Sequence, residues 1–226
     1  MGKLLKTLAL ACAVLAAQGT SAAPIVTNAS FEVDAVATSL AVTSVTGWTV
    51  GNVEASSYPY LIDNAYGAST PYGDQFFVPG YYGVGGTNYI EQAIGGFTVG
   101  NTYTLSFAIA TERSDAVGAQ SGITVSFPSG SSTAAANFYA LDSGTSYWRN
   151  WDLLTYDFLA TASSVTVRFT QNAGRGAAGA GYDVGLDNVS ISDAGAGATV
   201  PEPASLALLG IGLAGLGAAR RRKATT

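Results

Sequence analysis

The stretch Tyr103-Thr-Leu-Ser-Phe-Ala-Ile109 decides the fold class of this chain. Its large apolar residues occupy every second position and alternate with Thr104, Ser106 and Ala108. Successive side chains of a strand point to opposite faces, so this pattern predicts a strand with one buried face. Similar runs, broken by Gly, Asn and Asp, are expected to form strands at 123–127, 151–159, 164–169 and 185–191. With no amphipathic helix between them, they predict an all-β sandwich over residues 23–192.

The composition excludes most familiar kinds of active site. The chain has no histidine, and its one cysteine, Cys12, lies in the N-terminal leader described below. Disulfides, Cys/His zinc sites, Ser-His-Asp triads and Cys-His nucleophiles are therefore excluded from the remainder. Between residues 23 and 199 there is no lysine, while all but one of the 15 Asp and Glu residues lie there. A segment this acidic repels the phosphates of nucleic acid, so nucleic-acid binding is excluded. The composition suits one soluble extracellular domain.

The first 22 residues have the pattern of a secretory signal peptide. Lys3 and Lys6 flank the start of an apolar stretch, 4–17, and small residues follow it up to Ala22. Cleavage after Ala22 would make Ala23 the first residue of the mature protein. The alternative, an N-terminal membrane anchor, requires a longer apolar stretch than this one.

The C-terminal segment, 200–226, has the pattern of a membrane anchor. A small-residue linker, 193–199, leads into it, and the uncharged apolar run 204–219 is followed by the basic residues 220–223. As a helix that run would span about 24 Å, less than a hydrocarbon core of about 30 Å. The basic cluster predicts a cytoplasmic C-terminus and an external domain. The prolines just before the run favour an extended backbone that a membrane protease can reach.

Signal peptide, Pro201-Glu202-Pro203, short apolar helix and arginine cluster, in that order, resemble the PEP-CTERM family. Its members are substrates of exosortases in Gram-negative bacteria that make extracellular polysaccharide. The resemblance implies a transient stay in the inner membrane and processing near Pro201-Glu202-Pro203 by an exosortase-type membrane protease. Release to the cell surface or the extracellular space would follow, and a permanent anchor is the alternative.

The middle of the chain resembles the galactose-binding-like jelly rolls typical of carbohydrate-binding modules. The resemblance rests on these phrases: Asn28-Ala-Ser-Phe-Glu32, Gly47-Trp48, Ile90-Glu-Gln92, Phe97-Thr-Val-Gly100, Tyr156-Asp-Phe158 and Leu186-Asp-Asn-Val189. It implies a jelly-roll β-sandwich. In many such folds the first and last strands share a structural Ca²⁺, an ion that takes carboxylate and carbonyl oxygens. The matching positions here are Glu32 and Asp187; alternatively, Asp187 caps a turn and Glu32 is solvated.

Tyrosines are concentrated in the irregular stretch 58–89, which is interleaved with Gly, Pro, Asn and Ser. They are Tyr58, Tyr60, Tyr66, Tyr72, Tyr81, Tyr82 and Tyr89. A tyrosine offers a flat apolar ring to a sugar and a hydroxyl to its polar rim, so these residues are candidate ligand contacts unless they cover the core. In a second aromatic group, 147–151, we expect Trp148 on the surface as a ligand contact and Trp151 in the core, as we do for Trp48.

Three functions remain compatible with these features. The first is a non-catalytic surface module that binds polysaccharide, with no catalytic residue assigned. The second is a structural matrix protein without a ligand, which the richness in Gly, Ala, Ser and Thr allows. The third is a glycoside hydrolase, which needs two carboxylates and neither His nor Cys. Asp63 with Asp74, or Asp152 with Asp157, would be its pairs.

Overall fold

Eleven β-strands make up the regular structure of the part of the chain that the computed structural model describes, namely residues 23–51, 53, 58–63, 67–80, 88–112, 120–140, 147–175 and 183–194. They are β1 (Ser39–Ala41), β2 (Thr49–Gly51), β3 (Tyr60–Asp63), β4 (Gln75–Val78), β5 (Tyr89–Gly95), β6 (Thr102–Thr111), β7 (Gln120–Ser129), β8 (Ala136–Tyr139), β9 (Asp152–Leu159), β10 (Ser164–Arg175) and β11 (Val184–Asp193). The five strands expected from the sequence correspond to β6, β7, β9, β10 and β11. All of them lie in the first of two compact units, Met1–Asp193 and Ala194–Thr226.

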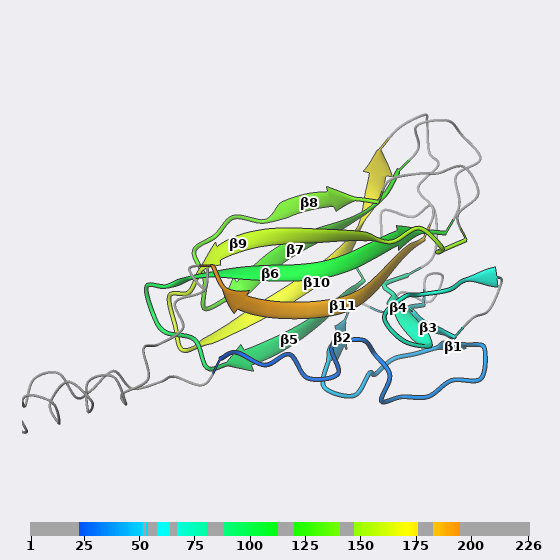
Figure 1. Ribbon diagram of the computed structural model, residues 1–226, viewed down its shortest axis with the longest axis horizontal. Helices are drawn as coiled ribbons and strands as arrows, with labels where there is room; N and C mark the ends of the chain where they lie inside the picture. The colour runs from blue at the N-terminus through cyan, green and yellow to red at the C-terminus, as the bar shows by residue number, and fades with distance from the viewer. Residues whose placement is uncertain are drawn as a thin grey trace, which may run out of the picture. The chain divides into compact units, whose positions relative to one another are not determined.

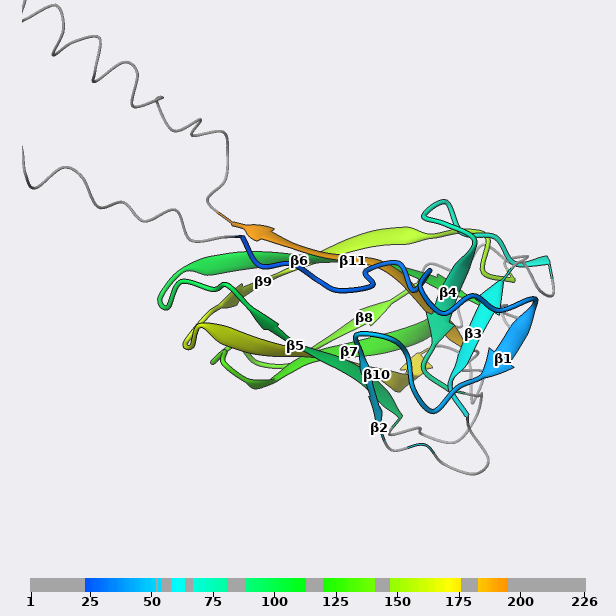
Figure 2. The same cartoon turned by 90° about the horizontal axis from the view of Figure 1, so that it is seen from below.

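The strands form two antiparallel sheets. One has six strands in the order β1-β3-β4-β11-β6-β9, and the other has five in the order β2-β5-β10-β7-β8 (Figure 1). Figure 2 shows β6, β9 and β11 in one layer and β5, β7 and β10 in the other. The all-β sandwich predicted from the sequence is confirmed.

The main core lies between the two sheets and follows the alternation of the strands. On β6 the side chains of Tyr103, Leu105, Phe107 and Ile109 are buried in it. Phe107 meets Phe169 of β10 across the interface, with 5.3 Å between ring centroids. Each such large side chain contributes about 1.5–3 kcal/mol when fully buried. Trp48, 6% exposed, also belongs to this core, as expected.

A β-bulge interrupts the pairing of β11 with β6 between Asp187 and Ser190. Asn188 adopts a φ of 50° there. One extra residue in a strand reverses the faces that later side chains occupy. Leu186 and Val189 can therefore both lie in the main core, while Asp187 points to the outer face of the sheet.

No helix in the described part of the chain is long and apolar enough to cross a membrane. The expected signal peptide 1–22, sorting residues 201–203, transmembrane helix 204–219 and basic tail 220–223 lie outside the described residues. Only the first two positions of the expected linker 193–199 lie inside them.

Candidate functional site

A second apolar cluster lies on the outer face of the six-stranded sheet. On β3, Leu61 faces the main core, and the next residue, Ile62, faces outward into the second cluster. The buried members of this cluster are Ile62, Ala68, Phe76, Val78, Ala110 and Trp148, and Tyr60 and Trp151 pack against them. The sheet is therefore covered on both faces where β3, β4, β6 and β11 meet.

Gly185 of β11 lies beneath both tryptophans of this cluster. A Cβ atom at Gly185 would lie 2.9 Å from Trp148 Cδ1 and 2.9 Å from Trp151 Cη2. Non-bonded carbon atoms prefer separations of about 3.5–4.0 Å. The indole rings therefore rest directly on the backbone of β11, and glycine is the residue that permits this contact.

Trp148 is buried, which corrects the expectation that it lies on the surface. Its side chain is 2% exposed, and its ring centroid lies 5.5 Å from that of Phe76. The loop around it has positive φ at Tyr147 (37°) and Trp148 (50°), and the Trp148 N–H donates to the Thr111 carbonyl at 2.9 Å. The surface prediction was wrong because it assumed a single core, whereas Trp148 fills a second one.

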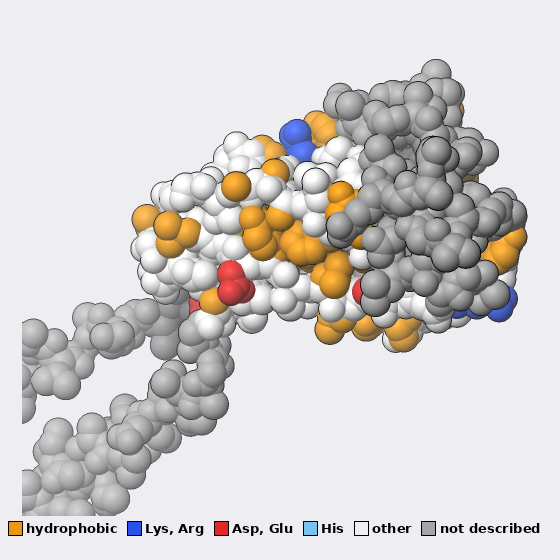
Figure 3. All heavy atoms as spheres, turned by 90° about the horizontal axis from the view of Figure 1, so that it is seen from above, with side chains coloured by type: hydrophobic (Ala, Val, Ile, Leu, Met, Phe, Trp, Pro, Cys, Tyr) orange, Lys and Arg blue, Asp and Glu red, His pale blue; other side chains and the backbone are white. Residues whose placement is uncertain are grey.

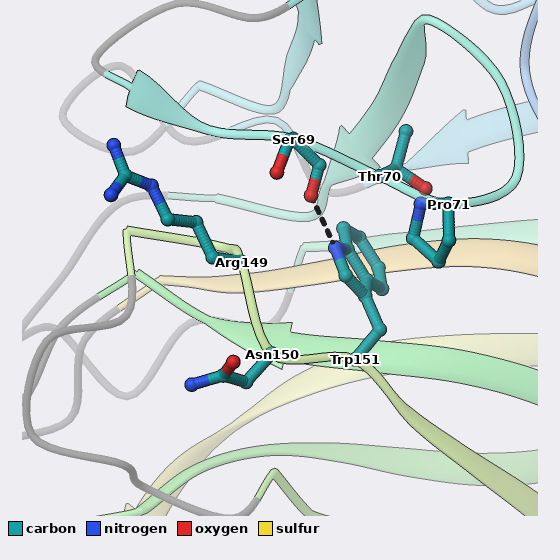
Figure 4. A pocket seen from close by; sticks show the side chains of 6 residues that line it. All are labelled: Ser69, Thr70, Pro71, Arg149, Asn150 and Trp151. Atoms are coloured by element: carbon teal, nitrogen blue, oxygen red, sulfur yellow. Dashed lines mark hydrogen bonds between the residues drawn. The ribbon is translucent and has the colours of Figure 1, made fainter.

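Trp151 is only half-buried and forms the wall of a pocket. Its Nε1 donates to the carbonyl oxygens of Ser69 at 2.8 Å and of Trp148 at 3.1 Å. Its ring meets Phe76 and Tyr72 edge-on, with centroid distances of 5.1 and 6.4 Å. These contacts hold the indole in one orientation, and its remaining surface faces the pocket (Figure 4).

The pocket has a volume of about 490 Å³. Its lining consists of Ser69, Thr70, Pro71, Arg149, Asn150 and Trp151 (Figure 4). An aromatic ring and a proline thus stand beside hydroxyl, amide and guanidinium groups. Such a mixture suits a ligand with both apolar and polar faces.

Arg149 is the charged residue of the described lining. Its Nε donates to the Gly67 carbonyl oxygen at 2.5 Å. Gly67 has a φ of 75°, and a Cβ there would lie 2.5 Å from Arg149 Nη2. Glycine at this position therefore leaves the space that the guanidinium occupies.

Of the tyrosines expected to contact a ligand, none is in the described lining of the pocket, and one contacts Trp151. Tyr72 lies against Trp151, Tyr60 packs into the second cluster, and Tyr58 is 40% exposed. Tyr89 lies on β5 with the Arg168 guanidinium 3.8 Å from its ring centroid. The other expected contacts, Tyr66, Tyr81 and Tyr82, lie outside the described residues.

Sequence reasoning missed most of the pocket lining. It singled out the group 147–151 as aromatic, but it placed the wrong tryptophan at the surface. Ser69, Thr70 and Pro71 have no distinguishing pattern, because they reach the pocket through the pairing of distant strands. The available signal was the sequence Trp-Arg-Asn-Trp at 148–151, whose polar middle residues between two tryptophans indicate an exposed turn.

The expected calcium ligands Glu32 and Asp187 are close enough for the charge of Glu32 to act on Asp187, and Glu32 Oε1 accepts hydrogen bonds from the N–H groups of Asp74 and Gln75, each at 2.9 Å. Asp187 is fully buried, and its two oxygens accept hydrogen bonds from Thr70 Oγ1 at 2.5 Å and from the Asn188 N–H at 2.6 Å. Burial raises the pKa of Asp187 to about 7, and the charge of Glu32 acts in the same direction. Carboxylate oxygens are among the ligands that Ca²⁺ takes. No group of three acidic residues that would hold a metal occurs among the described residues, so carbonyl or hydroxyl oxygens would complete such a site.

The C-terminal segment has a recognisable signal. Residues 199–223 match the PEP-CTERM protein-sorting motif. This match confirms the resemblance seen at Pro201-Glu202-Pro203 and its flanks, and it implies that the chain is exported. No curated protein matches the chain.

Solved structures are similar to the sandwich at low sequence identity. A cyclase from Fischerella sp. TAU is 17% identical with a TM-score of 0.54, over 76% of this chain and 96% of that one. A family 35 carbohydrate-binding module from Clostridium thermocellum is 15% identical with a TM-score of 0.43, over 70% and 99%. The enzymatically active domain of tailspike protein 4 from bacteriophage CBA120 is 11% identical with a TM-score of 0.49, over 74% of this chain and only 21% of that one. The two antiparallel sheets form the jelly-roll sandwich that the sequence predicted.

Proposed function

We propose that this exported protein binds polysaccharide at the cell surface or in the extracellular matrix without cleaving it. The observation that carries the proposal is the pocket, in which a fixed indole stands beside hydrogen-bonding side chains. A sugar ring has an apolar face of C–H groups, which stacks on an aromatic ring, and a rim of hydroxyl groups. Trp151 supplies the aromatic face, and the polar side chains of Ser69 and Asn150 lie in the lining beside it, where sugar hydroxyls would meet them.

The described lining of the pocket holds no pair of acidic residues, in keeping with binding without hydrolysis. Glycoside hydrolysis needs two carboxylates on either side of the scissile bond. None of the described lining residues is Asp or Glu. On β9, Asp152 is paired with the core-facing Ile109 and Asp157 with the outward-facing Thr104, so these two acids occupy opposite faces of the strand. Asp63 pairs with Gln75, next to Asp74, and neither acid lines the pocket.

The proposal is tested by binding of the purified full chain to a glycan array, with hydrolysis products monitored in the same samples. We expect saturable binding without products, and we expect Trp151→Ala to abolish it. Leu153→Ala, at an exposed apolar residue of β9 two positions after Trp151, is the matched control and should bind as the native chain does. Release of products would favour a hydrolase. Absence of both binding and products would favour a ligand-free matrix protein.

We also propose that an exosortase-type membrane protease processes the chain near Pro201-Glu202-Pro203, after a transient stay in the inner membrane. The match over 199–223 supports this order of events. The mass of the surface-exposed protein tests it, since processing removes the segment that follows the motif. A surface protein that retains the basic residues 220–223 would instead be permanently anchored.

We further propose a structural Ca²⁺ held by Glu32 and Asp187. Its support is the burial of Asp187 within reach of the charge of Glu32, since a cation would stabilise the ionised forms of both groups. Calcium would join the N-terminal segment to β11, which are already linked by the bond from the Val189 N–H to the Ala29 carbonyl at 2.9 Å. Calorimetric titration with Ca²⁺ tests this. No heat, together with an unchanged melting temperature at ~10⁻³ M Ca²⁺, would exclude a site of the usual extracellular affinity.

A further inference from the structure

The charge of Arg149 stands out because the domain holds so few cations. Between residues 23 and 199 there is no lysine, and arginines are the only basic residues. Few charged side chains appear on the face of the molecule drawn in Figure 3. A positive charge in the pocket is therefore unusual for this domain, and packing of the pocket does not require it.

The two arginine side chains that the structure describes have different surroundings. Arg168 is neutralised by Glu91, with 2.6 Å between Nε and Oε2, and its guanidinium also covers the ring of Tyr89. The Nε of Arg149 instead donates a hydrogen bond to the uncharged carbonyl of Gly67. No carboxylate among the described residues forms an ion pair with Arg149.

The backbone holds this guanidinium in a defined orientation. The bond to Gly67 occupies Nε and leaves the Nη1–Nη2 edge, for which no described residue is an acceptor. Arg149 follows Tyr147 and Trp148, two bulky residues with positive φ that the burial of Trp148 keeps in place. Positive φ at bulky residues is energetically unfavourable and is concentrated at binding and catalytic sites.

We infer that the pocket selects acidic polysaccharides, whose sugars carry carboxylates, as uronates do. This inference rests on the proposed function and names its substrate class. The free edge of a guanidinium donates two parallel hydrogen bonds to one carboxylate. Figure 4 shows the Arg149 side chain extending away from the indole, so Trp151 would stack on another sugar of the same chain. Since the domain is acidic, the Arg149 guanidinium gives the pocket a local attraction for an anionic chain.

The test compares each uronate polymer with its own methyl ester, which keeps the sugar backbone and removes the charge. The purified full chain is assayed on an array carrying such pairs and neutral glycans, at about 0.15 M ionic strength to screen distant repulsion. We expect the acidic form to bind about tenfold more tightly, the size of effect that one charge-assisted hydrogen-bonded pair produces. We expect Arg149→Gln to remove that preference and Arg149→Lys to retain part of it.

Arg168→Gln is the matched control, because it removes the other described arginine side chain from the opposite sheet. It should leave the preference for the acidic form unchanged. Equal binding of both forms by the native chain would overturn the inference and leave the proposed function standing. An unchanged preference in Arg149→Gln would also overturn the inference. Binding to no glycan on the array would overturn the inference and the proposed function together.

Discussion

Gly185 is the residue whose replacement should disturb the pocket most directly. An alanine Cβ there would lie 2.9 Å from atoms of both indole rings and 3.0 Å from Phe76 Cδ2. Overpacking of this kind costs about 1–3 kcal/mol, so we expect Gly185→Ala to lower the free energy of unfolding by that amount and to weaken glycan binding. Urea denaturation and the binding assay measure the two effects.

Gly95 provides the control, since it also lies in a strand, β5, and a Cβ there would meet no atom within 4 Å. Replacing a glycine by alanine in open space restricts the unfolded chain and stabilises by about 0.4–1 kcal/mol. We therefore expect Gly95→Ala to be neutral or slightly stabilising. Equal destabilisation by the two substitutions would show that the rings do not rest on Gly185.

Asp187 should make the stability of the calcium-free protein depend on pH. Burial raises its pKa from 3.8 to about 7, with Glu32 adding to the shift against the hydrogen bonds from Thr70 and Asn188. Between these pH values the folded state holds a proton that the unfolded state has released. The free energy of unfolding should therefore fall as pH rises, by about 1.4 kcal/mol per unit. The stabilisation is complete below the unfolded pKa and is lost once the pH passes the folded one.

Asp187→Asn isolates this effect, because it keeps the shape of the side chain and removes its titration. Urea denaturation over the pH range 4 to 7 gives the free energy of unfolding of each protein. That free energy should fall with rising pH in the native chain by the amount given above, and it should lack this fall in the variant. Added Ca²⁺ should remove the slope in the native chain, since a bound cation favours the ionised carboxylate. Identical curves for the two proteins would contradict the predicted titration.

The bulge in β11 lies in a strand that contacts both apolar clusters. Asn188 has a φ of 50°, a conformation that costs L residues other than Gly and Asn about 1–2 kcal/mol. Asn188→Val should therefore lower the free energy of unfolding by at least that amount, whereas Asn188→Gly should leave it nearly unchanged. Urea denaturation distinguishes them. If valine and glycine behaved alike, the bulge would not depend on this left-handed residue.

The long strands were predictable because their residues alternate over enough positions to establish a period of two. β6 and β10 are the best examples, with ten and twelve residues. β1 and β2 have three residues each, which is too short for a pattern. The second cluster was not predictable, because Trp148 and Trp151 lie in a loop whose contact with β11 depends on Gly185. The pocket was not predictable for the same reason, since Arg149 and Gly67 are far apart in the sequence and come into contact only in the folded domain.

At the scale of the whole domain, the pocket lies far from Asp193, the last residue of β11, because the two are at opposite ends of the long strands. Val184 at the start of β11 pairs with Thr111, and Asp193 at its end pairs with Tyr103. At about 3.3 Å per residue, this strand separates its two ends by roughly 30 Å. Trp151 immediately precedes β9, whose first residue pairs with Ile109, near the Val184 end. A chain held by the segment after Asp193 should therefore leave its pocket accessible.

Site-specific immobilisation tests this arrangement, because Cys12 is the only cysteine of the chain. In a Cys12→Ala background, Ala194→Cys and Asn150→Cys are each attached to a surface through the new thiol. Attachment at 194 should preserve glycan binding, since that position directly follows β11, whereas attachment at 150 should abolish it because Asn150 lines the pocket. Each variant is also assayed free in solution, so that loss of the Asn150 side chain is separated from obstruction by the surface. Loss of binding on attachment at 194 would place the ligand site at the C-terminal end of the sandwich instead of in the pocket beside Trp151.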